Sequence, residues 1–201
     1  MKLVNILFLL FFTFIFSSCK REKVIEKEKV NNNNDIIKKE FKRSKYFDED
    51  RIKDAKYAVK YKGDKASYAE LELYYVYNDL KKEEIIPYTL IMVEKYHKYE
   101  YASTAFMNLL EFYTDAKFTY DGTYISLLPY LKNFKKLNLD QKNYLIYFLK
   151  TGVKNENLGC VRYLEILNRE GIGISRNIKM ADSLKKKVIQ LEYKKHLRVK
   201  K

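Results

Sequence analysis

Residues that build tight turns are scarce in this chain. Its 201 residues include only six glycines and two prolines. A β-sandwich or β-barrel needs a tight turn every ~8–12 residues, and glycine and proline supply most of those turns. At the same time 47% of the residues are hydrophobic, too many for a wholly disordered chain. The composition therefore argues against a sandwich or barrel and for a folded chain built another way.

The middle of the chain repeats itself. Residues 66–79 match residues 102–115 when shifted by 36 positions, and a third copy follows at an offset of 55 from the second. Small residues at one recurring helical position allow two helices to cross closely. We expect this packing role for the small residues at the matching positions, which are Ala66, Ala69, Ala102, Ala105 and Cys160.

Apolar spacing predicts helices at each copy. From Ala102 to Tyr113 apolar residues recur every three or four positions, the period of an amphipathic helix. Between Ala69 and Tyr77 they alternate instead, as in a strand. Because this first copy matches the second, we interpret it as a helix too. A further apolar stripe runs along residues 178–191 and predicts the last helix.

Partner helices follow the copies. Proline is tolerated at the start of a helix, where its missing N–H has no intrahelical partner. Pro87 and Pro129, each followed by tyrosine and an apolar run, therefore predict the starts of two matching second helices. An inserted helix is expected from Asp140, as N-cap, to Lys150, with Gly152 beyond its end.

The third copy resembles a known repeat. Glu170-Gly171-Ile172-Gly173-Ile174, followed by Asn177 and Ala181, is similar to the Sel-one-like repeat, a relative of the tetratricopeptide repeat. The resemblance covers residues 156–190 and implies small Ala181 on the second helix. It also implies an α-solenoid whose concave face binds another protein. Gly171 and Gly173 suit the reversing loop, because glycine adopts positive φ without a Cβ clash. The predicted fold is all-α, a short α-solenoid of antiparallel helix pairs.

The first nineteen residues contain an export signal. Lys2 precedes an apolar run over 3–16, which is short for a bilayer span but typical of a signal peptide. Phe16-Ser17-Ser18-Cys19 resembles the lipobox of bacterial lipoproteins. This implies cleavage before Cys19, acylation of Cys19 and a lipid anchor in the bacterial cell envelope, with the protein facing the periplasm or the surface. The alternatives are ordinary secretion with Cys19 unmodified, or an uncleaved anchor helix.

Positive charge is concentrated at the two ends of the chain. Residues 20–47 carry a net charge of +5, residues 48–175 are neutral, and residues 176–201 carry +8. A nucleic-acid-binding domain places its basic patch on the folded body, so this distribution argues against nucleic acid as a partner. We interpret residues 19–47 as a charged, flexible tether and 48–201 as the helical-repeat domain. Both basic ends could also reflect a compositional bias alone.

The basic C-terminus provides an alternative function. In place of a protein partner bound by the repeats, the protein would bind an anionic envelope polymer or lipid headgroups. The candidate residues for such a patch are Lys185, Lys186, Lys187, Lys194, Lys195 and Arg198.

Motifs for chemistry are missing from the sequence. There is no P-loop, no Gly-x-Ser-x-Gly and no His-Glu-x-x-His, and the chain has only two histidines. Cys160 takes a packing position with no histidine nearby in sequence, so we interpret it as a buried structural thiol. We therefore expect a protein that is not an enzyme and that uses neither cofactor nor metal. The leading hypothesis is a membrane-anchored interaction module of the cell envelope.

Overall fold

The computed structural model describes residues 39–44, 47–117 and 123–199. Within these ranges all regular elements are helices, and no strand occurs. The chain divides after Ile52, inside helix α2 (Glu49–Lys62), into two compact units. In the first unit, residues 39–42 form a short helical segment. The remainder of the tether predicted over 19–47 is described only at 43, 44 and 47, and the predicted signal peptide and Cys19 lie outside the described residues.

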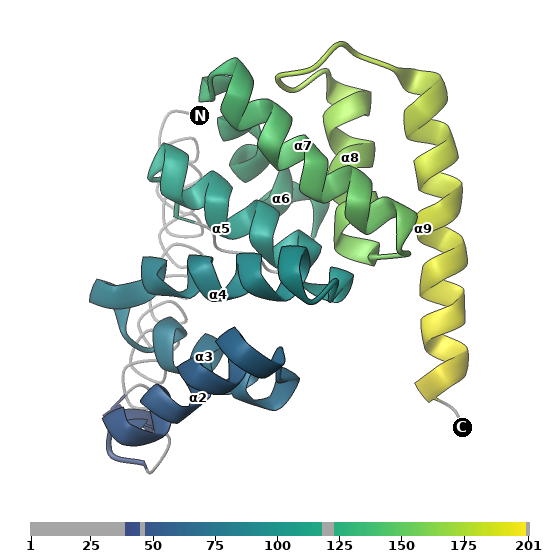
Figure 1. Cartoon of the computed structure of the whole chain (residues 1–201). Helices are drawn as coiled ribbons and strands as arrows, with labels where there is room; N and C mark the ends of the chain where they lie inside the picture. The colour runs from purple at the N-terminus through teal and green to yellow at the C-terminus, as the bar shows by residue number, and fades with distance from the viewer. Residues whose placement is uncertain (1–38, 45–46, 118–122, 200–201) are drawn as a thin grey trace, which may run out of the picture. The chain divides into compact units, whose positions relative to one another are not determined.

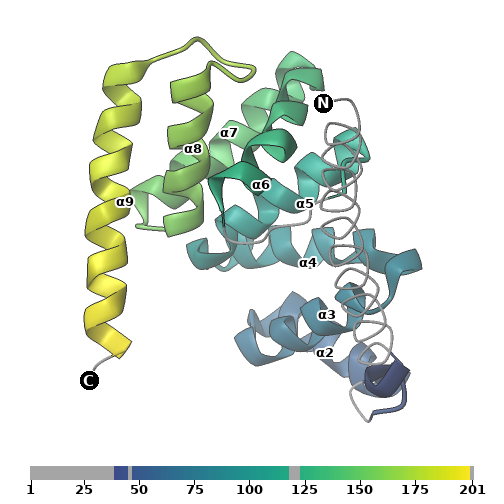
Figure 2. The ribbon, with the colours of Figure 1, turned by 180° about the vertical axis from the view of Figure 1, so that it is seen from behind.

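The second unit is a succession of helices. After α2 they are α3 (Lys65–Val76), η2 (Asp79–Ile85), α4 (Ile86–Leu90), the π-helical η3 (Ile91–Lys95), η4 (Tyr99–Tyr101), α5 (Ala102–Thr114), α6 (Tyr124–Leu131), η5 (Lys132–Lys136), α7 (Leu139–Lys154), α8 (Leu158–Glu170) and α9 (Ile178–Val199). Helix α5 packs against α7, α7 against α8, and α8 against α9 (Figure 1). The view from behind shows the same order (Figure 2). The predicted all-α fold class, a short α-solenoid of helix pairs, is confirmed.

A side-chain cap begins α3, and a buried polar contact connects α3 to α4. The Asp64 side chain accepts a hydrogen bond of 2.7 Å from the Ser67 N–H and begins α3. Tyr68 is fully buried, and its hydroxyl lies 2.7 Å from Oγ1 of buried Thr89 in α4. Helix α4 begins at Ile86 with Pro87 in its first turn, as predicted. The apparent strand between Ala69 and Tyr77 is part of α3, so the helical interpretation is confirmed.

The second proline does not start a helix. Helix α6 begins five residues before Pro129, because the Thr123 hydroxyl accepts a hydrogen bond of 3.2 Å from the Ser126 N–H and caps it there. Pro129 therefore lies inside α6, and the chain tightens into the 3₁₀ helix η5 from Lys132 onward. The prediction of a start at this proline was wrong, since a side-chain cap upstream fixed the beginning of the helix.

The inserted helix is longer than expected at both ends. Asn138, not Asp140, is the N-cap of α7, and it forms a capping box with Gln141: Asn138 Oδ1 accepts from the Gln141 N–H at 2.9 Å, and Gln141 Oε1 accepts from the Asn138 N–H at 3.0 Å. Gly152 does not end the helix but is buried inside it. A Cβ at Gly152 would lie 2.2 Å from Cys160 Sγ and 3.2 Å from Ala102 Cβ. Tertiary packing of α7 against α8 and α5, rather than helix termination, explains this glycine.

The α8–α9 pair shows why its loop contains two glycines. Gly171 ends α8 in the left-handed conformation with φ of 62°, and Gly173 has φ of 68°. A Cβ at Gly173 would also lie 2.6 Å from Cδ1 of the buried Phe134 ring. The positive φ expected at both glycines is confirmed. Asn177 then accepts a hydrogen bond of 2.9 Å from the Met180 N–H at the start of α9.

The small residues of the second and third copies are buried, but those of the first are not. Exposed fractions are 1% or less at the buried set, which is Ala102, Ala105, Cys160 and Ala181. Ala66 and Ala69 are exposed, so the packing role predicted for these two residues was wrong. Large side chains form the inward face of α3 instead, and these are Tyr68, Leu71, Tyr74 and Tyr75.

The buried residues of α3 and α5 indicate a different register for the first repeat than residue identity does. The buried residues Tyr68, Leu71 and Tyr75 lie 34 positions before the buried Ala102, Ala105 and Leu109. Matching alanine with alanine in the sequence gives a shift of 36 instead. In α3 these inward positions hold two tyrosines and a leucine where α5 has two alanines and a leucine, and no identical residues coincide, so residue identity does not reveal the correspondence.

Candidate functional site: the α3–α5 groove

Two hollows of about 410 and 440 Å³ lie beside α5: the larger opens between α3, η2 and α5, and the smaller between η2 and the C-terminal part of α5. Both are lined by Lys82 and Asn108, so they adjoin, and the two together are here called the α3–α5 groove. Its remaining lining residues in the larger hollow are Ala69, Glu72, Leu73, Tyr75, Val76, Ile85 and Thr104. In the smaller hollow they are Lys81, Glu83, Glu84, Ile86, Glu111, Phe112, Asp115 and Lys117.

The α3 wall of the groove is apolar. Ala69, Leu73 and Val76 are spaced i, i+4, i+7 and therefore share one face of the helix. Leu73 is 48% exposed and Val76 is 55% exposed, although both are large hydrophobic residues. Helix α3 thus carries two apolar stripes, one facing the core and one facing the groove. Exposed apolar residues grouped in this way mark interaction surfaces more often than single ones do.

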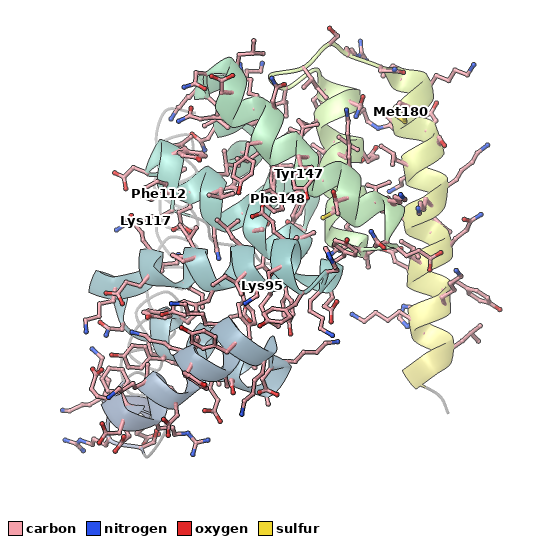
Figure 3. The ribbon with its side chains drawn as sticks, viewed as in Figure 1. Lys95, Phe112, Lys117, Tyr147, Phe148 and Met180 are labelled. Carbon is pink, nitrogen blue, oxygen red and sulfur yellow. The ribbon has the colours of Figure 1, made fainter. Side chains whose placement is uncertain are left out.

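The α5 wall has a mixed character. Thr104, Asn108 and Phe112 are spaced i, i+4, i+8 along this helix and line the groove. Phe112 is 50% exposed, whereas Phe106 on the inward face of the same helix is fully buried. Phe112, near the C-terminal end of α5, and Lys117, which follows the helix, both line the smaller hollow (Figure 3). This wall offers hydrogen-bonding groups in its middle and an aromatic ring near one end.

An ion pair connects η2 to the α5 wall. The Lys82 ammonium donates to both carboxylate oxygens of Glu111, at 2.7 and 2.9 Å. Because Lys82 lines both hollows, this pair lies where they meet. Both partners retain solvent contact, so the pair adds little to stability. It does fix the position of two charges beside the apolar wall.

A carboxyl group lies in the apolar part of the groove. Burial raises the pKa of Glu72 above its usual range, an effect partly offset by a hydrogen bond with the Tyr68 side chain. The native state therefore holds this proton more tightly than the unfolded chain does. The contribution of Glu72 to stability is consequently greatest below the ordinary glutamate pKa and is lost as the pH rises through the raised native value.

Glu72→Gln should therefore stabilise the protein at neutral pH relative to the wild type. The amide has the same shape but cannot ionise, so it avoids the burial of a charge. The advantage should vanish near pH 3, where the wild-type carboxyl is protonated in both states. Urea unfolding between pH 3 and 7 measures this, with exposed Asp54→Asn as the control. An advantage independent of pH would show that the charge of Glu72 is not the cause.

The basic residues predicted as a C-terminal patch differ in their surroundings. Successive residues of an α-helix point about 100° apart, so Lys187 lies on another side of α9 than Lys185. Lys187 donates a hydrogen bond of 2.6 Å to the Val153 carbonyl near the end of α7. Lys194 pairs with Glu156 at 3.1 Å. Lys185, Lys186 and Lys195 are exposed, while the Arg198 side chain lies outside the described part of the chain.

Cys160 is the one cysteine among the described residues, and helices enclose its thiol. Cys160 is fully buried, and its Sγ donates weakly to the Phe148 carbonyl at 3.8 Å. Burial raises the pKa of this thiol to about 12, so it carries a proton at neutral pH. A thiol in this state is a poor nucleophile and a poor metal ligand. Its environment is that of a packing residue in contact with α7.

Sequence reasoning missed the groove itself. Leu73 was matched to Leu109 of the second copy, yet Leu109 is buried and Leu73 is exposed. A signal was present in the alternation from Ala69 to Tyr77. A helix with apolar residues on two faces produces such a pattern, and an extra apolar face on a helix needs a second contact.

Neither the described helices nor the comparisons identify a membrane span or a family. None of the described helices has the length and apolarity needed to cross a bilayer. Among the described residues, no group of three metal-ligating side chains comes together. Protein-family models, curated proteins and solved structures give no match to this chain.

Proposed function

We propose that this protein is a lipid-anchored interaction module of the bacterial cell envelope. Its helical-repeat domain would hold an apolar helical segment of a partner protein in the α3–α5 groove. The observation that carries the proposal is the second apolar stripe of α3, formed by Ala69, Leu73 and Val76. These residues face a groove instead of another helix.

The spacing and chemistry of the residues that line the groove support a helical ligand. Both walls are helices whose lining residues recur with helical spacing, so a third helix could pack its own ridge between them. The ligand would place small apolar residues against Leu73 and Val76 and polar groups near Asn108. The fixed Lys82–Glu111 pair would restrict its orientation, because it offers one charge of each sign at a defined point.

The repeat register supports the proposed relation to helical-repeat proteins. A spacing of 34 residues, as found between the buried faces of α3 and α5, is the tetratricopeptide period. The α8–α9 pair, with its two positive-φ glycines, fits the Sel-one-like pattern proposed from the sequence. Repeat domains of this kind bind partners along an extended surface.

Lipid attachment at Cys19 accounts for the place of action in this proposal. Two or more acyl chains hold a protein stably at a bilayer, whereas one alone binds marginally. Cells grown with radiolabelled palmitate should incorporate label into the wild-type protein and lose it completely in Cys19→Ala. Cys160→Ala is the matched control and should keep the label. Label that persists in Cys19→Ala would refute the anchor.

The groove is tested by crosslinking in intact cells. A photo-reactive amino acid at Leu73 and another at Phe112 sample the two walls, and one at Leu139 samples a surface that is 72% exposed elsewhere. We expect the first two positions to give adducts with the same protein, identified by mass spectrometry, and the third to give none with it.

A charge placed in the groove should abolish that adduct. Leu73→Glu would bury an unpaired carboxylate under the ligand, so the Phe112 adduct should fall at least tenfold. Leu139→Glu should leave it unchanged, and circular dichroism should show equal helix content in both variants. Adducts with unrelated proteins at Leu73 and Phe112, or an adduct indifferent to Leu73→Glu, would contradict the proposed groove.

A further inference from the structure

Helix α9 has two apolar faces with different environments. Its inward face packs on the rest of the unit through Ala181, Leu184, Val188 and Leu191, all buried. On the opposite side Ile189, Tyr193 and Leu197 are 57%, 66% and 49% exposed. Their spacing of four residues places these three side chains on one stripe. This stripe is called the α9 outer stripe below.

The C-terminal end of the outer stripe, at Leu197, lies in the part of α9 that extends past its partner α8. Lys194 pairs with Glu156, and Glu156 precedes the first residue of α8. Residues of α9 beyond Lys194 therefore reach past the start of α8, and the two ribbon views show this overhang (Figures 1 and 2). Lys195 lies one turn beyond Leu191, the last residue of the inward face. It is nevertheless exposed, as expected for a part of α9 that no longer has α8 beside it.

The charge around the stripe is positive and uncompensated. The two acidic residues of α9 are both engaged by arginines of α8, Asp182 with Arg169 at 3.0 Å and Glu192 with Arg162. In contrast, four exposed lysines of α9 make no ion pair within the described residues, namely Lys179, Lys185, Lys186 and Lys195. Helical geometry places Lys185 and Lys186 on the same side of α9 as Ile189.

We propose that the outer face of α9 docks on the surface of an anionic lipid bilayer. Ile189 and Leu197 would enter the headgroup–acyl boundary, and Tyr193 would lie at the interface, where an aromatic ring with a polar tip is favoured. Lys185 and Lys186 would contact the anionic headgroups. The proposal does not depend on acylation of Cys19 or on the α3–α5 groove.

Charge favours a bilayer over a second copy of the chain. Pairing two α9 outer faces would bring uncompensated lysines of both copies together, with no unpaired acid of α9 to meet them. An anionic bilayer supplies the complementary charge over the whole face and also accepts the apolar stripe. Such binding should weaken with salt, because screening shortens the reach of the lysine charges.

The absence of tryptophan from this chain makes a direct test possible. Tyr193→Trp introduces a single indole on the stripe, and Tyr147→Trp, on α7 and 46% exposed, is the matched control. Both changes are made in the chain from residue 19 onward with Cys19→Ser, which keeps every described residue and lacks the acyl chains. The probes are vesicles of phosphatidylcholine alone or mixed with equal phosphatidylglycerol.

The expected result is a blue shift of the indole emission of Tyr193→Trp with the anionic vesicles only, lost at high salt, and no shift for Tyr147→Trp. Ile189→Gln with Leu197→Gln should lower partitioning at least tenfold without loss of helix content. Lys185→Gln with Lys186→Gln should flatten the salt dependence. An unchanged Tyr193→Trp emission spectrum with anionic vesicles would overturn the proposal. So would a blue shift without vesicles accompanied by dimers in sedimentation, which would assign the face to a second copy.

Discussion

Replacing Phe106 by alanine is expected to lower the free energy of unfolding by about 3–5 kcal/mol, the range for removing a buried phenylalanine ring. Phe106 is fully buried in α5. Its ring centroid lies 6.1 Å from that of Phe134 in η5 and 5.7 Å from that of Tyr163 in α8. The side chain thus connects α5 with η5 and α8, and its loss would leave a cavity between them. Chemical denaturation followed by circular dichroism measures the effect.

Phe112→Ala is the matched control for this prediction. It removes the same side chain from the same helix, but at a position that is 50% exposed. We expect its effect on the free energy of unfolding to stay within about 0.5 kcal/mol, as for surface substitutions generally. Equal losses in the two variants would contradict the packing of α5 described above. Under the proposed function, Phe112→Ala should instead weaken partner binding.

The second large effect is expected at Gly152, where alanine should destabilise the protein by about 2 kcal/mol. On helix propensity alone this change would stabilise α7 by up to ~1 kcal/mol. The added Cβ, however, would lie 2.2 Å from Cys160 Sγ and 2.7 Å from Cys160 Cβ. Helices α7 and α8 would have to separate, and overpacking of a filled core typically costs about 1–3 kcal/mol. Steric overlap should therefore outweigh propensity.

A double variant identifies the cause. Cys160→Ala removes the sulfur atom nearest to the new methyl group, so Gly152→Ala should cost less in that background than in the wild type. The coupling between the two changes should fall within the roughly 0.5–3 kcal/mol seen for residues in contact. Additive effects, or a gain of stability in Gly152→Ala alone, would mean that α7 and α8 do not approach each other this closely.

Local features of the sequence were sufficient to predict most helices. The apolar period from Ala102 to Tyr113 predicted α5, Pro87 predicted the start of α4, and the pair Gly171 and Gly173 predicted the loop before α9. Each of these signals concerns residues within a few turns of one another. The structure that each signal predicts depends on backbone sterics and on which side of one helix is apolar. Both can be determined without knowing which other helices pack against that segment.

Predictions that required a neighbour were less successful. Glycine is common just beyond the end of a helix, and this predicted a helix end before Gly152. The role of Gly152 is instead its close contact with Cys160, which lies on another helix. Ala69 matched Ala105 in sequence and not in environment. Identity of residue type does not fix the rotation of a helix about its axis, because that rotation depends on which of two apolar faces meets the core.

The sequence by itself determined that the chain is helical, where most helices lie and how the last pair reverses direction. The tertiary structure decided which face of α3 remains open, that α7 lies between α5 and α8, and that the outer stripe of α9 faces away from the core. The physical reason is the range of the interactions. Turn geometry and apolar periodicity depend on residues close together in the chain. Which face of a helix is buried depends instead on the other helices that pack against it, and these come from distant parts of the chain.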